Sequence, residues 1–597
     1  MNTIKKYLYI LSVRELKYAA ILLIMMVILA LLEMAGVLSI MPFMAVLLNP
    51  EVVETNDLLN SVYRNSNIIG INTRKEFIFF LGIAVFLVLI ISILFKLLTN
   101  YLQVRFTVGR NYSLAKRLVE GYLNQPYSWF LNRNSAELGR TILSDVNQVI
   151  GRGLNSLLEF IKHCFITIAI LTILILVDTK LTLIVGSTLG LTYLFIFFLI
   201  RKFLGKMGQK RLDAYKWMFR FVNEAFGATK EIKVSGLENT YIKRFSKPAR
   251  SLVSISALVH LIGQTPRSLL EVIAFGGIML LSLFLMLESA NFAQAITLIA
   301  LYTFAGYRLI PSLQQMYVSL TSLKFIGPTL DSVYKDLKNL PEFNKQLSKD
   351  TLTLNKEIAF NNISFNYPNS EKTALKNINF KIPAQNIVGI VGATGSGKTT
   401  TVDIILGLLE TKKGSLEVDG KIIDKNNLRT WQRSIGYVPQ HIFLSDDTVA
   451  ANIAFGIDPN KINYGAVERS AKIAKIDKFI TNDLPQKYET FIGERGIRLS
   501  GGQRQRIGIA RALYHSPKVL ILDEATSALD NNTEKQVMKE IKNLGKNMTI
   551  IMIAHRLSTI RECDSIILLE KGELKGQGTF EELIEINNDF KSAAKDL

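Results

Sequence analysis

The order of apolar and polar positions divides the chain into two parts. In the first part, apolar residues form runs of about 20, the length that a helix needs to cross the hydrocarbon core of a bilayer. From about Leu352 onward, short apolar runs alternate with mixed segments, a pattern typical of strands alternating with helices. The sequence predicts a helical membrane domain over 1–325, a linker over 326–351 and a soluble α/β domain over 352–597.

Six apolar runs are predicted to cross the membrane. They are Tyr18 to Leu48, Phe77 to Phe95, Leu158 to Val177, Leu181 to Ile200, Ser268 to Leu287 and Phe292 to Ile310. The first run is interrupted by one charged residue, Glu33. It is longer than the apolar core of a signal peptide and has no clear cleavage site, so it is predicted to be kept as a membrane helix.

Basic residues in the loops indicate the orientation of these helices. The loops after the second and fourth runs are rich in Lys and Arg, whereas the turns after the third and fifth runs hold Lys180 as their only basic residue. Lys and Arg gather on the cytoplasmic side of membrane proteins. We therefore expect a multi-pass protein of the inner (cytoplasmic) membrane, with both termini, the long loops and the soluble half in the cytoplasm.

Charge and cysteine content narrow the possible partners. The net charge is +20, which could indicate a nucleic-acid partner, but the basic excess lies beside the apolar runs, where anionic lipid head groups would face it. We expect membrane lipids as partners and no nucleic acid. The two cysteines, Cys164 and Cys563, lie in different halves and support no disulfide framework.

Three loops have a helical pattern. The long loops are predicted to continue the membrane helices into the cytoplasm, for example over 111–122 and 209–226. In the outer loop, Asp57 to Tyr63 followed by Ile68 and Ile69 could form a short amphipathic helix on the membrane surface. An ordinary folded loop is the alternative there.

A glycine-rich loop follows a predicted buried strand, Ile387 to Val391. The loop matches G-x-x-x-x-G-K-[ST] after a strand and before a helix, which is the setting of a phosphate loop. Lys398 is expected to reach the β- and γ-phosphates and Thr399 to bind Mg²⁺, so ATP and Mg²⁺ are the predicted cofactors. The residues predicted to bind nucleotide here are Gly392, Ala393, Thr394, Gly395, Ser396, Gly397, Lys398, Thr399 and Thr400.

A second apolar strand, Val519 to Asp523, ends in a carboxylate. Asp523 is placed to hold Mg²⁺, and the adjacent Glu524 could activate or orient the attacking water. The alternative is an acidic pair that caps the next helix. The phosphate loop upstream favours the catalytic interpretation.

The segment Leu499 to Gln503 reads LSGGQ and resembles the signature of the ABC superfamily. Six spans followed by one such cassette is the layout of an ABC exporter half-transporter. The resemblance implies an α-helical membrane domain of the ABC exporter type joined to an α/β P-loop nucleotide-binding domain. It also implies a homodimer, in which the signature residues of one chain face the ATP of the other. Those residues are Ser500, Gly501, Gly502 and Gln503.

The same resemblance assigns roles to further residues. Tyr367 is implied to stack on adenine, Gln440 to touch Mg²⁺ and sense the membrane domain, and His555 to lie near the γ-phosphate. The implied catalytic residues are Glu524, His555 and Gln440, and the implied metal ligands are Thr399, Gln440 and Asp523.

Family resemblance also points to segments that join the two halves. Pro126 to Phe130 and Phe221 to Gly227 resemble the first and second coupling regions, which would dock on the cassettes near Gln440. Ser527 to Asp530 resembles the D-loop.

Charged residues near membrane depth indicate the cargo, because such residues usually face a cavity or a partner. Lys96, Arg267 and Arg308 could line a cavity and bind an anionic head group. Alternatively, they belong to the cytoplasmic helix extensions or reach to the interface. The full set of candidates is Glu33, Lys96, Arg105, Lys162, His163, Arg267, Glu271 and Arg308.

Together with the outer helix and the stretch Lys230 to Lys233, these charges make the chain similar to PglK-type flippases. That likeness implies an ATP-driven transporter that flips a lipid-linked oligosaccharide with a pyrophosphate head. A general lipid or multidrug exporter is the main alternative. A nucleotide-gated regulator or channel is a further one, which the presence of both Glu524 and His555 disfavours.

Overall fold

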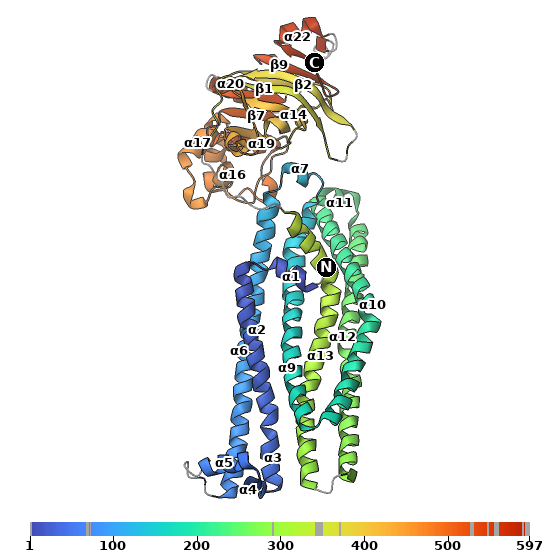
Figure 1. Cartoon of the computed structure of the whole chain (residues 1–597). Helices are drawn as coiled ribbons and strands as arrows, with labels where there is room; N and C mark the ends of the chain where they lie inside the picture. The colour runs from blue at the N-terminus through green and yellow to red at the C-terminus, as the bar shows by residue number, and fades with distance from the viewer. Residues whose placement is uncertain are drawn as a thin grey trace. The chain divides into compact units, whose positions relative to one another are not determined.

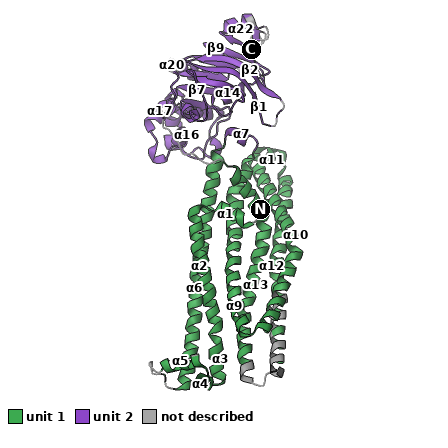
Figure 2. Ribbon diagram, in the orientation of Figure 1, with its two compact units in different colours: residues 1–125, 133–343 green, residues 126–132, 344–597 purple. Residues whose placement is uncertain are grey.

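The computed structural model describes residues 3–66, 71, 73–288, 292–340, 350–368, 370, 372–525, 530–545, 548–553, 560–587 and 590–591. It divides into two compact units, which Figure 2 shows in different colours. Unit 1 contains residues 1–125 and 133–343, and unit 2 contains residues 126–132 and 344–597.

Unit 1 is helical, and its longest helices run alongside one another (Figure 1). The helices are α1 (Thr3–Ile10), α2 (Val13–Leu38), α3 (Ile40–Leu48), α4 (Val52–Thr55), α5 (Asp57–Ser66), α6 (Arg74–Leu123), α8 (Ser135–Arg140), α9 (Asn155–Val177), α10 (Thr179–Gly227), α11 (Thr229–Ser235), α12 (Glu238–Glu288) and α13 (Phe292–Asn339). Between α8 and α9 lie two π-helical segments, Thr141–Asp145 and Gln148–Leu154.

Five helical segments of the described part of the chain are apolar and long enough to cross a membrane. They contain the first four predicted spans and most of the sixth. The fifth predicted span, Ser268 to Leu287, lies within α12, where many side chains fall outside the described residues. Several of these helices have about twice the length that a bilayer requires, as expected if they extend beyond it.

Local sequence signals set where the membrane helices begin. α2 begins with a capping box, in which the Ser12 amide donates to Glu15 Oε2 at 2.8 Å and the Glu15 amide donates to Ser12 Oγ. Thr73 and Glu76 form the same pair at the start of α6. The Leu181 amide donates to Asp178 Oδ1 at 3.0 Å, which caps α10 directly after the turn that follows α9.

The first predicted span, Tyr18 to Leu48, is not one helix. It is divided at Ser39, where α2 ends and α3 begins. The Ser39 hydroxyl donates to the carbonyl of Gly36 at 2.9 Å, and Pro42 has no amide hydrogen to continue the ladder. Ser39 keeps a helical backbone conformation, so the two helices still form one continuous apolar segment.

The outer loop does contain a helix, α5, which covers the predicted stretch Asp57 to Tyr63. Ile68 and Ile69 lie outside the described residues. Tyr63 of α5 packs edge-to-face on the buried Phe77 of α6, with ring centroids 5.0 Å apart. Part of the apolar face of α5 therefore rests on its own chain, which an isolated surface helix would not do.

The second predicted coupling region is not a separate helix. Phe221 to Gly227 forms the last turns of α10. The break comes after it, at Ala228, and the short α11 that follows ends at Gly236 in a left-handed conformation. Lys230 and Lys233 lie on α11.

The core of unit 1 is a cluster of aliphatic side chains between α2, α9 and α13. It includes Leu29 of α2, Ile166 and Ile170 of α9, and Leu301 and Ala305 of α13, all buried. Apolar contact between helices gives little advantage over lipid, so close packing and polar contacts decide which helices associate.

Unit 2 contains two sheets. The antiparallel sheet has the order β2-β1-β4-β5 and the larger, mainly parallel sheet has the order β10-β9-β3-β8-β7-β6. The strands are β1 (Glu357–Asn366), β2 (Thr373–Pro383), β3 (Ile387–Val391), β4 (Lys413–Val418), β5 (Lys421–Ile422), β6 (Ile435–Val438), β7 (Val519–Asp523), β8 (Thr549–Ile553), β9 (Ser565–Glu570) and β10 (Glu573–Gly578).

Every residue of β3, β7 and β8 is buried, as expected for strands covered on both faces. The helices of unit 2 include α7 (Tyr127–Phe130), α14 (Lys398–Ile405), α15 (Leu428–Gln432), α16 (Val449–Ile453), α17 (Tyr464–Ile473), α18 (Asp477–Asp483), α19 (Gly501–Leu513), α20 (Asn531–Gly545) and α22 (Phe580–Ile586).

Candidate functional site

The predicted nucleotide residues gather at one edge of the larger sheet. β3, β8 and β7 are parallel neighbours, and in register Ile390 lies opposite Ile553, which lies opposite Asp523. The phosphate loop follows β3 and Glu524 follows β7. Since ligands bind beyond the carboxyl ends of parallel strands, this edge is the expected binding position.

The phosphate loop needs its glycines. Gly392 and Gly397 have φ angles of +150° and +106°. A Cβ on Gly392 would lie 2.1 Å from the carbonyl oxygen of Leu569, and one on Gly397 would lie 2.6 Å from Leu375 Cδ2. Neither position can hold a larger residue without moving its neighbours, so glycine is required here for both backbone angle and space.

Two polar side chains of this loop fit a phosphate ligand. Lys398 Nζ donates to the carbonyl oxygens of Gly392 and Ala393 at 2.7 and 3.1 Å, so the loop folds around the ammonium group. Burial lowers the pKa of Lys398, while the charges of Glu524 and Asp523 act in the opposite direction. Ser396 Oγ is buried and has no hydrogen-bond partner within the described residues, which leaves it available to a ligand.

The two carboxylates, Asp523 and Glu524, and Gln440 lie together at this edge. Gln440 Nε2 donates to Glu524 Oε2 at 2.7 Å. Asp523 is buried at the end of β7, with its Oδ2 3.5 Å from the hydroxyl of Tyr437. Glu524 has a φ of +50°, an uncommon conformation for a residue with a side chain and one that recurs at functional sites.

The aromatic residue predicted to stack on adenine lies beside the phosphate-loop helix. Tyr367 follows β1, and its hydroxyl is 3.0 Å from Thr400 Oγ1 of α14. Its ring contacts Phe365 edge-to-face, with centroids 5.1 Å apart. The ring is thus fixed next to the predicted phosphate site.

The signature residues form the N-terminus of α19. The amide of Gln503 donates to Ser500 Oγ at 3.2 Å, and the amide of Ser500 donates to Gln503 Oε1 at 2.8 Å. This capping box fixes the end of a helix whose N-terminal dipole favours an anion. His555 and Ser527 to Leu529 of the predicted D-loop lie outside the described residues.

Comparison with known families agrees with this arrangement. Residues 21–306 match the ABC transporter transmembrane region, and residues 375–527 match the ABC transporter family. An ATP-dependent lipid A-core flippase of Cupriavidus metallidurans is 30% identical over 82% of this chain and 82% of its own length. The protein of the same name from Pseudomonas fluorescens is 31% identical over 83% of this chain and 81% of its own.

The chain belongs to the ABC transporter family. A solved structure of a bacterial Atm1-family ABC exporter with ATP bound has the same fold, with a TM-score of 0.79 at 22% identity over 96% of this chain and 97% of that one. The chain is thus an ATP-driven ABC half-transporter, with a membrane domain joined to a cassette that binds and hydrolyses ATP.

The membrane domain of this ABC transporter pairs its predicted cavity cations with acids. Arg308 Nη1 lies 2.5 Å from Glu33 Oε2, and Lys96 Nζ lies 4.0 Å from Glu33 Oε1. Arg267 is not part of this group. It pairs with Glu271 at 2.8 Å, one turn along α12, and its side chain is largely exposed.

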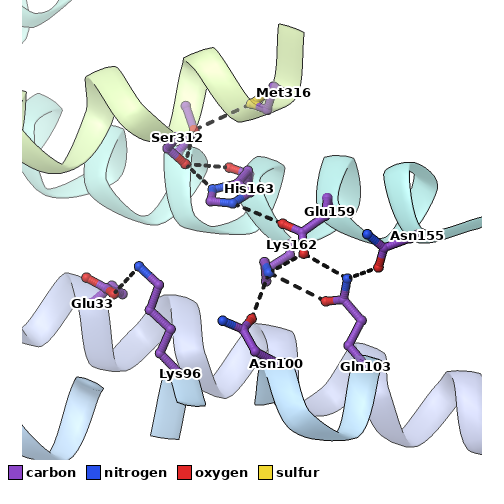
Figure 3. Close-up of polar contacts among 11 residues, drawn as sticks. Glu33, Lys96, Asn100, Gln103, Asn155, Glu159, Lys162, His163, Ser312 and Met316 are labelled. Atoms are coloured by element: carbon purple, nitrogen blue, oxygen red, sulfur yellow. Dashed lines mark hydrogen bonds and ion pairs between the residues drawn. The ribbon is translucent and has the colours of Figure 1, made fainter. Parts of the chain in front are cut away.

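A second polar cluster in the transporter, here called the Glu159 cluster, joins α6, α9 and α13 (Figure 3). Glu159 Oε1 lies 2.7 Å from Lys162 Nζ, and Glu159 Oε2 lies 3.4 Å from His163 Nε2. Gln103 Nε2 of α6 donates to Glu159 Oε1 at 2.8 Å, and His163 Nδ1 is 2.9 Å from Ser312 Oγ of α13.

Sequence reasoning named Lys162 and His163 of this cluster as charged residues at membrane depth but did not group them with Glu159. A local signal was present, since Glu159 has Lys162 and His163 three and four positions after it, which places all three on one helix face. The contacts of Gln103 and Ser312 could not be predicted from the sequence, because these residues lie on other helices, far from Glu159 along the chain.

Proposed function

We propose that this ABC exporter acts as a homodimeric flippase, which moves a lipid with an anionic head group out of the cytoplasmic leaflet of the inner membrane. The observation that carries the proposal is the group formed by Glu33, Lys96 and Arg308, which holds more positive than negative charge at membrane depth. Ionisable residues in membrane segments usually mark the path of a substrate. The relatives named ATP-dependent lipid A-core flippases support a lipid as cargo.

For the substrate itself, we propose a lipid-linked oligosaccharide with a pyrophosphate head. Arg308 can bind phosphate oxygens in a planar, bidentate manner, and Lys96 adds a second positive charge. Lipid A-core is the second candidate, which the names of the relatives favour. Arg267 is included as a more distant contact for the head group.

In the cassette, the proposed assignment follows the geometry. Lys398, Thr399, Asp523 and Gln440 would hold the nucleotide and Mg²⁺, which supplies charge neutralisation at the phosphates when bound. Glu524 would orient the attacking water, with Gln440 holding its carboxylate. We assign His555 to the γ-phosphate as the resemblance implies.

The proposed link between ATP and transport is α7. Residues 126–132 group with the cassette in unit 2, although they lie within the first half of the sequence. Burial raises the pKa of Tyr127, and the charge of Asp403 in the phosphate-loop helix raises it further. The interaction with Asp403 supports a position of Tyr127 near α14, from which α7 would respond to nucleotide.

Purified protein in liposomes tests the function. A fluorescent lipid-linked oligosaccharide, a fluorescent lipid A and a cationic drug are offered in parallel, and ATP-dependent movement to the other leaflet is measured. We expect movement of the lipid-linked oligosaccharide, and none with Glu524→Gln protein. Movement of lipid A alone would transfer the assignment to the second candidate, and movement of the drug alone would refute a lipid flippase.

A further inference from the structure

Glu33 is the centre of a small group of charges contributed by three helices, α2, α6 and α13. Its side chain is only 3% exposed, whereas those of Arg308 and Lys96 are 18% and 42% exposed. Figure 3 shows Lys96 reaching from α6 toward Glu33. The carboxylate is therefore enclosed, whereas Lys96 is open to other groups and Arg308 is partly so.

Glu33 forms ion pairs with its two cationic neighbours but no hydrogen bond with them. Within the described residues, neither of its oxygens has a hydrogen bond of good geometry. Arg308 Nε is likewise buried without an acceptor in the described part of the chain, although Nη1 of the same side chain lies 2.5 Å from Glu33. The guanidinium thus keeps an unused donor, and one carboxylate does not neutralise two cations.

The neighbouring Glu159 cluster has the opposite character. Lys162 is 4% exposed at its side chain and lies 2.7 Å from Glu159. Its ammonium also donates to Asn100 Oδ1 at 3.0 Å. Glu159 and Lys162 there carry one charge of each sign, and the partners enclose the lysine. The accessible, unbalanced cations are those at Glu33.

We infer that Glu33 is an internal competitor for the anionic head group of the substrate, so that a phosphate oxyanion binds Arg308 and Lys96 by displacing the Glu33 carboxylate. The inference rests on the proposed function and adds to it a residue that sets affinity and release. No covalent change is involved. The ring of Phe304, 5.8 Å from the Arg308 guanidinium carbon, helps keep the guanidinium in place during the exchange.

Competition of this kind has a functional consequence. A transport site must bind strongly enough to load and weakly enough to unload. A carboxylate that returns to the cations would lower the affinity for the head group and promote its release. Removing the carboxylate should therefore raise affinity and slow turnover, and these two effects distinguish competition from a purely structural role.

The test compares wild-type and Glu33→Gln protein in phosphatidylcholine vesicles that contain a fluorescent polyprenyl diphosphate. Binding is measured without nucleotide, and flipping is measured with ATP. We expect the half-saturating probe concentration of the variant to fall about fivefold, because the attraction between Glu33 and the exposed Lys96 is modest and the buried pair with Arg308 repays little beyond its desolvation cost. Its maximal flipping rate should also fall. Inorganic pyrophosphate should displace the probe from both proteins, and at lower concentration from Glu33→Gln.

Further variants keep the test decisive. Glu33→Gln/Lys96→Gln is compared with Lys96→Gln, so that the two proteins differ only at Glu33 and both lack the Lys96 contact. Tighter binding by the double variant would support competition, and equal or weaker binding would overturn it. Glu54→Gln removes an exposed carboxylate that pairs with Arg74 and should change nothing.

The outcomes separate the inference from the proposed function. If wild-type protein flips the probe but Glu33→Gln binds it no more tightly, competition by Glu33 is wrong and the flippase assignment stands. If neutral polyprenol displaces the probe and pyrophosphate does not, the site does not bind an oxyanion, and the inference is wrong. If wild-type protein flips no anionic lipid, the proposed function fails and the inference fails with it.

Discussion

At the scale of single residues, Glu524 is held by both backbone and side chain. It has a φ of +50°, and its carboxylate accepts a hydrogen bond from Gln440 at 2.7 Å. We expect Glu524→Gln to lower the ATPase rate by about 10²–10⁴-fold, the usual contribution of a positioned acid–base group. Phosphate release in detergent measures the rate, and a fluorescent ATP analogue measures binding, which should persist.

Gln440→Ala is the matched control for this prediction. It removes the hydrogen-bond donor but keeps the carboxylate, so its rate should fall less than that of Glu524→Gln. A Glu524→Gln protein that hydrolyses ATP at the wild-type rate would show that another group orients the water.

Asp419 stabilises the antiparallel sheet at the turn between β4 and β5. Its carboxylate accepts the backbone amides of Asn355, Lys356 and Glu357 at 2.8, 2.8 and 3.0 Å. Asp419→Ala leaves these donors without their partner and should destabilise the cassette by about 1–3 kcal/mol, toward the lower end because water can reach the site. Thermal unfolding of the purified protein measures the loss.

This prediction includes a pH dependence. Burial raises the pKa of Asp419, but the three amide donors outweigh it and hold the pKa below its ordinary value. The folded state thus favours the carboxylate, and the stabilisation is present above the ordinary carboxyl pKa and lost as the pH falls through the lowered one. The difference between wild type and Asp419→Ala should shrink on acidification, and a constant difference would contradict this account.

Residues whose chemistry is local in sequence could be predicted. The phosphate loop, from Gly392 to Thr399, needs its glycines and lysine at fixed spacing, so the motif alone predicts its position after β3. The pairing of Glu33 with Arg308 could not be predicted, because it depends on how α2 packs beside α13. The sequence identifies both charged residues as candidates, but it does not show that they form an ion pair.

At the scale of helices, the Glu159 cluster is expected to fix α9 to its neighbours. Lys162 is buried, and Glu159 is its acidic partner at 2.7 Å. Glu159→Gln would leave a buried ammonium group without that partner, which typically costs about 3–5 kcal/mol. We expect a lower melting temperature in detergent and faster amide exchange in α9.

Two variants control this prediction. Glu159→Gln/Lys162→Met removes both charges and should recover much of the lost stability, since the cost arises from the unpaired charge. Glu120→Gln removes one member of an exposed pair with Lys116 on α6 and should alter stability by less than about 1 kcal/mol. Equal melting temperatures for Glu159→Gln and Glu120→Gln would show that the cluster does not hold α9.

The membrane helices were predictable as elements because each must satisfy its own backbone hydrogen bonds in lipid, which makes a long apolar run a sufficient signal. Their interruptions were less predictable. The break at Ser39 depends on a side-chain hydrogen bond, and the packing of Tyr63 on Phe77 depends on a contact between α5 and α6. Hydropathy carries no information on either.

At the scale of the whole molecule, one chain carries every part of a nucleotide site, although the proposed site is shared between two chains. Lys398 begins α14, after the sheet strand β3, and Ser500 caps α19. If two copies associate with each phosphate loop facing the partner's signature, each ATP contacts Lys398 of one chain and Ser500 of the other. The membrane charges at Glu33 would then also be present twice.

Mixed dimers test this arrangement. One chain carries Lys398→Ala, the other carries Ser500→Glu, and differently tagged copies allow the mixed dimer to be purified. Each homodimer should be inactive, whereas the mixed dimer keeps one shared site with both Lys398 and Ser500 intact and should hydrolyse ATP at about half the wild-type rate, as two-fold symmetry with independent sites requires. The matched control places both substitutions in one chain beside a wild-type partner. That dimer contains the same two changes, but each shared site then carries one of them, so it should be inactive. Sites formed within single chains would give the reverse result, with an active control and an inactive mixed dimer.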